Sequence, residues 1–367
     1  MSSLVVTGEG VVSSAGVGPT AMRSALAASS RQPPDVRGLY PEALPYTSAH
    51  ALTDFDVRAL LGRKGTSFLD RATGLALVAC GQAIGHSGMV PGTWAPERTG
   101  IALGTTVGSL RSSSDYSRET LLAERPYLVN PVLFPNTVMN CAAGQAAIWY
   151  RLKGVNSTVA GGPLGFLGAL RYGMNVLRRG YADAMLIGAV EEFTPHTAWA
   201  HYLRHAVGLP GEAAAVFVVE RAESARAAGR TPVAELAAVR GGFHPGGGEG
   251  LAKRLTASMR EALEDAALEP WQVDRLAFSE AGGAADEAIG TAAFSGLLGP
   301  YSAARIRVRE ALGECGAAAG ALQFAALLPA PRAAQDGRGG LLAGWTREGA
   351  FEVAVIKDIS GAGDSSG

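Results

Sequence analysis

Cysteine and histidine are the side chains of this sequence that most readily carry out nucleophilic or metal chemistry. Its three cysteines, Cys80, Cys141 and Cys315, are isolated and form no CxxC pair, as is typical of reduced cytosolic thiols. Cys80 and Cys315 lie in helix-forming stretches rich in small residues, where a cysteine is most simply a core residue. Cys141, which follows Asn140, is interpreted in the same way.

Two short patterns could indicate a cofactor. Residues 195–205 (PHTAWAHYLRH) contain three histidines, two of them four residues apart, which could bind a metal on one helix face. No glutamate stands where a zinc protease helix needs one, so no metal site is predicted. Gly8 and Gly10 follow a strand, but Ser13 replaces the third glycine of a dinucleotide motif, and no acidic residue closes a strand about 20 residues later. The sequence therefore predicts no cofactor.

The remaining chemistry depends on residues 156–192, which predict a strand, a glycine-rich turn, a helix and a second strand. Ser157–Ala160 is β-prone, and Gly161, Gly162 and Pro163 interrupt it. Apolar residues at helical spacing then continue to Leu177. Ala184–Ala189 is a continuous apolar run, typical of a strand buried on both faces.

The rest of the chain predicts one large α/β unit. The 367 residues are 47% hydrophobic and 18% charged, with a net charge of −1, which gives no indication of a nucleic acid or an anionic membrane as partner. We see no signal peptide and no apolar run of about 18 residues, so we expect a cytoplasmic protein. Strands and helices recur in two similar series, which predicts halves at 1–229 and 230–359, followed by a disordered Gly/Ser tail at 360–367.

The central stretch resembles the nucleophile segment of the β-ketoacyl synthases, condensing enzymes of thiolase fold. In that family a cysteine sits on the sharp turn, where the helix dipole and backbone amides lower its pKa and form an oxyanion hole. The helix ends in a glycine, here Gly180, before a strand of the pattern Ala-Asp-hydrophobic-Gly-Gly-Glu, which here ends at Glu191. The family's spacing puts the nucleophile position at Pro163. The resemblance implies a thiolase-like α/β fold of two related βαβαβ-type halves in five αβαβα layers.

Three further signatures of that family are degenerate. The histidine of its Glu-Ala-His-Gly-Thr motif is replaced by Gly282, and in its Lys-x-x-x-Gly-His motif Arg309 replaces the lysine and Glu314 the histidine. Its Gly-Phe-Gly-Gly loop is replaced by Trp345-Thr346-Arg347-Glu348-Gly349. Only Phe193–Pro210 stands where the family has a longer loop that frames the active-site entrance. Claisen condensation needs a thiolate to hold the acyl chain and imidazole donors to stabilise the enolate, and these replacements supply neither.

A retained scaffold without this chemistry is similar to the chain-length factors, the non-catalytic subunits that pair with a catalytic ketosynthase in type II polyketide synthases. Many of them carry glutamine at the nucleophile position, so Pro163 departs from their pattern. The resemblance implies no catalysis by this chain alone, a heterodimer with the catalytic ketosynthase, and an acyl carrier protein as the second partner. The chain would complete the acyl tunnel and control polyketide chain length.

The resemblance also implies positions for these roles. A chain-length gate is expected on the segment after the Gly104 strand, and a dimer interface of more than ~2,000 Å² is expected mainly within residues 130–180. The strand at 156–160, which we expect to lie centrally, would pair with its counterpart across the dimer axis. The gate residues are Leu110, Ser113 and Ser117; the interface residues are Asn156, Ser157, Thr158, Val159, Ala160, Phe134 and Met139. Because the segment that carries Leu110, Ser113 and Ser117 is rich in serine, a polar surface helix is the alternative to a gate there.

One alternative function remains. The chain could be an active acyltransferase or hydrolase of thiolase fold that uses Cys315 or Cys141 together with Glu314.

Overall fold

The computed structural model describes residues 3–28, 31–89, 94–280, 283–329 and 338–359. Gly282 and the predicted tail at 360–367 lie outside these residues. Within them, no helix combines the length and the apolar character that a membrane crossing requires.

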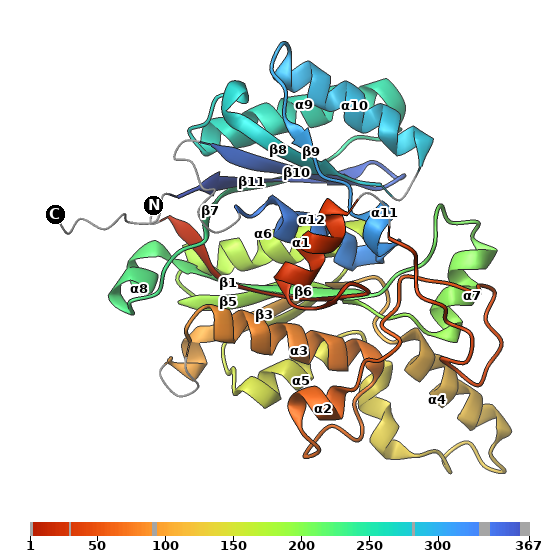
Figure 1. Ribbon diagram of the computed structural model, residues 1–367. Helices are drawn as coiled ribbons and strands as arrows, with labels where there is room; N and C mark the ends of the chain where they lie inside the picture. Colours follow the sequence, from red (N-terminus) through yellow and green to blue (C-terminus); the bar gives the residue numbers. More distant parts are fainter. Residues whose placement is uncertain (1–2, 29–30, 90–93, 281–282, 330–337, 360–367) are drawn as a thin grey trace.

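Five layers of alternating helices and strands make up the fold (Figure 1). The strands follow one hydrogen-bonded order, β4-β3-β5-β6-β1-β7-β11-β10-β8-β9, with β2 paired to β1. β1 and β7 join through only two residue pairs, Val5 with Glu235 and Val6 with Ala234. The two ends of this order form separate layers, and α6 and α12 lie between them. α3 and α5 cover one outer face and α9 and α10 the other, so the predicted αβαβα arrangement is confirmed.

The strands lie close to their predicted positions. The lower layer of Figure 1 contains β1 (Leu4–Ser13), β3 (Thr99–Thr105), β4 (Asn156–Ala160), β5 (Ala184–Glu191) and β6 (Ala213–Arg221). The upper layer contains β7 (Ala234–Phe243), β8 (Val273–Phe278), β9 (Ala304–Arg305), β10 (Gly339–Trp345) and β11 (Ala350–Asp358), and β2 is Gly16–Val17. The predicted boundary between the halves falls between α8 and β7.

The helices include several that the sequence pattern did not predict as separate elements. They are α1 (Pro19–Ala27), α2 (Val57–Leu61), α3 (Arg71–His86), α4 (Leu110–Leu122), α5 (Cys141–Tyr150), α6 (Gly165–Arg178), α7 (Pro195–Leu203), α8 (Ala222–Ala227), α9 (Gly248–Asp265), α10 (Ala284–Leu298), α11 (Arg309–Leu312) and α12 (Gly316–Leu327). Short 3-10 turns are η1 (Pro96–Arg98), η2 (Pro131–Thr137), η3 (Gly162–Leu164) and η4 (Pro270–Gln272).

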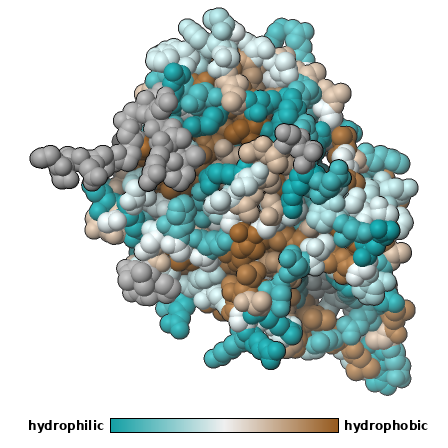
Figure 2. All heavy atoms as spheres, in the orientation of Figure 1, coloured by the Kyte–Doolittle hydropathy of each residue, from teal (hydrophilic) through white to brown (hydrophobic). Residues whose placement is uncertain are grey.

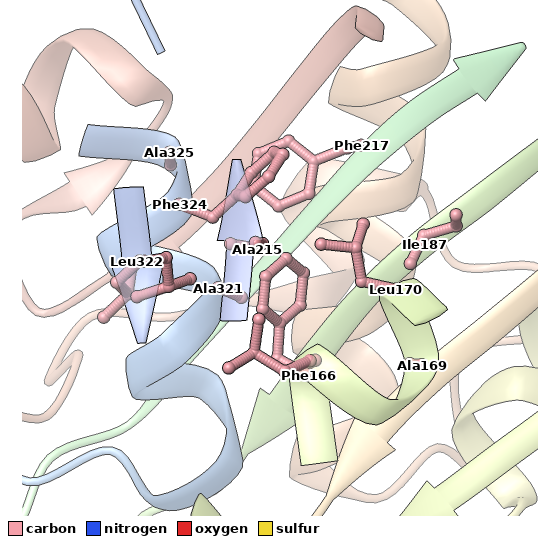
Figure 3. Close-up of a cluster of buried hydrophobic side chains, with 14 of the residues drawn as sticks. Phe166, Ala169, Leu170, Ile187, Ala215, Phe217, Ala321, Leu322, Phe324 and Ala325 are labelled. Atoms are coloured by element: carbon pink, nitrogen blue, oxygen red, sulfur yellow. The ribbon is translucent and has the colours of Figure 1, made fainter. Parts of the chain in front are cut away.

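The core between the two sheets fixes α6 and α12 together. Phe166 of α6, Phe217 of β6 and Phe324 of α12 are fully buried, and their ring centroids lie 4.7 to 5.8 Å apart (Figure 3). Tilted aromatic pairs at these distances add to the stabilisation from apolar burial. The helix that begins at the nucleophile turn and the helix that follows Glu314 are therefore held by one cluster.

The N-terminus of α6 lies directly against β3. A Cβ atom on Gly104 would lie 2.3 Å from the carbonyl carbon of Gly165, so only glycine permits this approach. Gly162, with a φ of 53°, makes the left-handed turn before the helix, and Gly180, with a φ of 74°, follows its C-terminus. The predicted strand, turn and helix are thus confirmed.

β4 lies at the end of the strand order, so within this chain it is an edge strand and not the central strand that we expected. Its residues are exposed or partly exposed, unlike those of β5, which are all buried. A strand of this kind presents unpaired backbone groups along its outer side.

Candidate functional site

The residues at the predicted nucleophile turn and at two of the degenerate signatures lie together. Pro163 occupies the middle of η3, immediately before α6, where the family's cysteine would stand. It lines a cavity of about 20 Å³ together with Glu280, Arg309 and Glu314. A volume of this size is close to that of a single water molecule. The sequence-predicted positions thus form one site, with the exception of Gly282, which is not among the described residues.

Carboxylates dominate this small site. Burial raises the pKa of Glu314 and of Glu280, and the two carboxylates repel one another. Glu314 accepts a hydrogen bond from the backbone N–H of Gly316 at 3.0 Å. Glu280 accepts hydrogen bonds from the backbone N–H groups of Val308 and Arg309 at 3.2 and 3.0 Å. A site of this composition resists additional negative charge.

Arg309, which replaces the family's lysine, forms a hydrogen bond to the backbone of Glu280. Its guanidinium donates a hydrogen bond to the carbonyl of Glu280. This contact ties the start of α11 to the segment that follows β8. The guanidinium of Arg309 therefore stabilises the local backbone at the site.

Glu191, at the end of β5, is a site residue that the sequence analysis did not assign. Its carboxylate accepts hydrogen bonds from the backbone N–H groups of Thr106 and Ala317, so it links β3 to α12. Burial raises its pKa to about 7, and the neighbouring Glu314 adds to the shift. Its place in the family's Gly-Gly-Glu strand was the signal that could have identified it.

Trp345, which begins the altered C-terminal loop, points into the core. It is 3% exposed and stacks on Phe278, with ring centroids 5.8 Å apart at an angle of 24°. Its indole N–H donates to Asp286 at 2.9 Å. The side chain therefore fills the space between β10 and α10.

The cysteines lie in environments that favour the neutral thiol. Cys315 is 1% exposed, its Sγ lies 3.3 Å from the carbonyl oxygen of Leu312, and burial raises its pKa well above the usual value. Burial, reinforced by Asp70, raises the pKa of Cys141 to about 11. Since the thiolate is the nucleophilic form, neither environment activates a cysteine.

The three histidines do not form a metal site. α7 ends at Leu203 and His205 has a φ of 50°, so His201 and His205 do not share a helix face. His201 instead hydrogen-bonds to Tyr46 at 2.8 Å. Within the described part of the chain, no group of three or more histidine, cysteine or acidic side chains could hold a metal ion.

The predicted gate residues lie on α4, next to a cavity of about 490 Å³. Leu110 and Ser113 are partly buried and Ser117 is exposed. Ser113 donates a hydrogen bond to the carbonyl of Thr137 at 3.0 Å, so this face of α4 lies against η2. The cavity is lined by the neighbouring face of the helix, together with η2 and two earlier segments; its walls include Arg111, Ser112, Asp115, Tyr116, Tyr40, Arg71, Leu133 and Glu192. The gate assignment stays a prediction.

Large apolar side chains are exposed around α4, η2 and α5. Phe134 is 55% exposed, Met139 51% and Leu121 83%. Figure 2 shows brown, hydrophobic surface at the lower right, over the region of α4 in Figure 1. Exposed apolar side chains that gather in one region make it a candidate interaction site.

Comparisons with known proteins place this geometry in a family. The model of the β-ketoacyl synthase N-terminal domain matches residues 1–210. The chain is 26% identical over 297 residues to 3-oxoacyl-[acyl-carrier-protein] synthase 2 of Coxiella burnetii, which covers 74% of this chain and 72% of that protein.

Solved structures show the same fold over nearly the whole chain. The ishigamide ketosynthase/chain length factor superposes with a TM-score of 0.85 at 34% identity, covering 97% of this chain and 99% of that chain. A type II polyketide synthase ketosynthase, AntDE, in complex with its acyl carrier protein AntF, superposes with a TM-score of 0.78 at 17% identity, covering 98% and 100%. At that identity the second likeness concerns the fold alone. The nucleophile turn, the thiolase-like layers and these matches together show that the chain belongs to the β-ketoacyl synthase family.

Proposed function

We propose that this chain is the non-catalytic, chain-length-factor-like subunit of a type II polyketide synthase, paired with a catalytic ketosynthase. The observation that carries the proposal is the intact nucleophile turn with Pro163 at its centre and Glu314 lining the same cavity. The turn and the helix that follows it are kept, while Pro163 has neither a nucleophilic side chain nor a backbone N–H to donate to an oxyanion.

The chemistry of condensation explains why these replacements matter. Pro163 has no nucleophilic atom and cannot hold an acyl chain. An enolate would develop negative charge beside Glu314, where a family member supplies an imidazole, and near Glu280. The buried, protonated thiols of Cys315 and Cys141 offer no replacement nucleophile, so nothing specific favours the alternative of an active acyltransferase.

Pairing with the ketosynthase would occur through β4 and the surface beside it. The open edge of β4 would continue one sheet across two subunits, with Asn156–Ala160 facing their counterpart. Phe134 and Met139, both about half-exposed, would then be covered. An interface of more than ~2,000 Å² is the size expected for such an obligate pair.

Two similar proteins support a ketosynthase and an acyl carrier protein as the proposed partners. The ishigamide protein, 34% identical, is by its name a ketosynthase/chain length factor, and the AntDE ketosynthase is in complex with an acyl carrier protein. We accordingly propose a carrier protein that delivers the acyl chain to the partner's cysteine. This chain would line the far end of the acyl tunnel and limit its length.

The gate would lie on α4, where Ser113 contacts η2 and Leu110 and Ser117 lie on the same side of the helix. Replacing Ser113 or Ser117 by phenylalanine adds a ring that a packed tunnel can accommodate only by displacing the acyl chain. We expect both variants to shorten the main product and Leu110→Ala to lengthen it or broaden its distribution.

The test is mass spectrometry of the carrier-bound product made by the purified complex. Ser112→Phe is the comparison variant, because Ser112 lies on the neighbouring face of α4 that lines the 490 Å³ cavity and therefore reports whether the acyl chain also uses that cavity. Unchanged product lengths for Leu110→Ala, Ser113→Phe and Ser117→Phe, with the complex still assembled, would show that this face is only a polar surface. A shift with Ser112→Phe alone would move the gate to the cavity face.

A further inference from the structure

α4 is held in place almost entirely by polar contacts. None of its residues is fully buried, although most helices in folded proteins are stabilised by packing an apolar face. At its N-terminus Ser109 donates a hydrogen bond to the buried carboxylate of Glu192 at 3.1 Å. Farther along, the ring of Tyr116 lies 5.7 Å from that of Phe134. The position of the helix therefore depends on a few identifiable side chains.

Arg111 makes the contacts that connect α4 to the opposite wall of the 490 Å³ cavity. Its Nη2 atom lies 2.7 Å from Oε1 of Glu42, and its Nε atom lies 3.3 Å from Oδ2 of Asp115 on the next turn of α4. The guanidinium carbon lies 5.2 Å from the ring centroid of Tyr40. A planar guanidinium can form an ion pair and stack on an aromatic ring at the same time, which an ammonium does less well.

Tyr40 gives this clamp a fixed support. Its hydroxyl donates a hydrogen bond to the carbonyl of Phe193 at 2.6 Å, and its ring packs at 6.4 Å from the Phe193 ring. Phe193 is 1% exposed, so the support belongs to the core. Tyr40 and Arg111 both line the cavity. The distance between α4 and the segment at 40–42 thus sets the width of that cavity.

We infer that Arg111 is a positioning residue for product length, because it clamps α4 to Tyr40 and Glu42 and so fixes how much room the acyl chain has beside the helix. The inference rests on the proposed function and deepens it. Arg111 acts through α4, and loss of the clamp lets the helix move outward and the cavity widen.

The test uses the complex with the catalytic ketosynthase and two readouts. Hydrogen exchange of the α4 amides reports whether the helix has loosened, and mass spectrometry of carrier-bound products reports chain length. With Arg111→Ala we expect faster α4 exchange and a rise of about threefold or more in the ratio of longer to main product, the size of effect that loss of one partly exposed charge contact allows. Arg111→Lys should restore part of the wild-type distribution.

Arg118 on the same helix supplies the matched control. Arg118 is exposed, and within the described part of the chain it forms no ion pair. Arg118→Ala should therefore change neither readout. Glu42→Gln removes the clamp from the opposite wall and should act in the same direction as Arg111→Ala, with a smaller than additive effect when the two are combined. If Arg111→Ala prevents assembly, Glu42→Gln carries the test.

Faster exchange without a change in product length would overturn the inference, and so would unchanged exchange. The gate variants separate this outcome from failure of the proposed function. If Ser113→Phe or Ser117→Phe changes product length while Arg111→Ala does not, only the clamp is refuted. If none of them changes it, the chain-length role itself fails.

Discussion

Single residues decide the chemistry that this site can perform. Pro163 occupies the turn where the family has its nucleophile, and the cavity beside it contains Glu314 where the family has an imidazole, together with Glu280 and Arg309. Restoring one residue should therefore not restore the reaction. The stabilisation of a developing enolate needs donors already in place, and no histidine is among the described residues that line the cavity.

We predict that Pro163→Cys creates no condensing activity. The new thiol would have a helix N-terminus beside it, but the enolate would still form against Glu314 and Glu280. Condensation by the complex should be measured with the partner's own cysteine inactivated, because only then does turnover report this site. Turnover above that background would contradict the prediction. In the same assay with an intact partner, Cys315→Ala should stay near wild type, and a loss of more than about tenfold would show that the thiol participates.

A second residue-scale prediction concerns pH. The folded chain holds a proton on Glu191 more tightly than the unfolded chain does, because burial raises its pKa from 4.5 to about 7. The stability contributed by this protonation is complete below about pH 4.5 and is lost as the pH rises through 7. Relative to Glu191→Gln, whose side chain does not titrate, the wild-type free energy of unfolding should fall by roughly 1–3 kcal/mol between pH 5 and pH 8.

Urea unfolding of both proteins across that pH range checks the sign. If the wild-type free energy of unfolding, relative to that of Glu191→Gln, stays constant or rises between pH 5 and pH 8, the carboxyl group of Glu191 does not hold a proton in the folded chain.

The residue scale also shows what sequence could predict. Pro163, Arg309 and Glu314 were found by counting along family motifs, and the structure brings them to one cavity. The sequence identified Glu191 only as part of a family motif. It could not predict the hydrogen bonds of Glu191, because Thr106 and Ala317 come from distant parts of the chain. Contacts between residues that are distant in the sequence produce no pattern in the neighbouring sequence.

At the scale of elements, the open edge of β4 determines how subunits could join. Ile101 donates its N–H to Val155 and Gly161 donates to Thr105, which fixes the register of β4 on β3. In a parallel ladder of this register, the N–H groups of Ser157 and Val159 point to β3, and that of Thr158 points outward. The outer side is therefore free to pair with a partner strand.

We predict that Thr158→Pro weakens the heterodimer by at least about tenfold, because it removes an outward N–H while the bonds to β3 are kept. Val159→Pro is the contrasting variant and should damage folding, because its N–H serves β3. Sedimentation velocity of the co-purified subunits measures the first effect, and circular dichroism of each chain measures the second. Normal assembly of Thr158→Pro would exclude β4 as the pairing strand.

The elements were largely predictable where the periodicity was strong. α6 ends one residue after the predicted Leu177, and β5 extends two residues beyond the predicted Ala184–Ala189, because their apolar residues are at helical spacing or continuous. The segment of α4 was expected as a polar stretch that either forms the gate or is a polar surface helix, and its extent was not predicted because a helix without a buried face carries little apolar pattern. β4 was expected to be central, and it lies at the end of the strand order of this single chain; the pairing across a subunit boundary that the resemblance implies stays a prediction.

At the scale of the whole molecule, the exposed apolar surface requires an explanation. Phe134 and Met139 are about half exposed, and their exposure in a single chain would be an aggregation liability. We predict that Phe134→Asp or Met139→Asp reduces co-purification of the ketosynthase. Tyr301→Asp, at an equally exposed ring after α10, should leave co-purification unchanged. Loss of the partner in all three variants would point to unfolding and not to an interface.

The central claim is that this chain shapes the acyl tunnel and holds no acyl group itself. The most direct test is to incubate the intact complex with an acyl-loaded carrier protein, quench it, and map acyl adducts on both subunits by mass spectrometry. The account predicts an adduct on the catalytic cysteine of the partner and none on Cys80, Cys141 or Cys315. A stoichiometric adduct on Cys315 or Cys141, lost together with turnover when that residue is replaced by alanine, would contradict it.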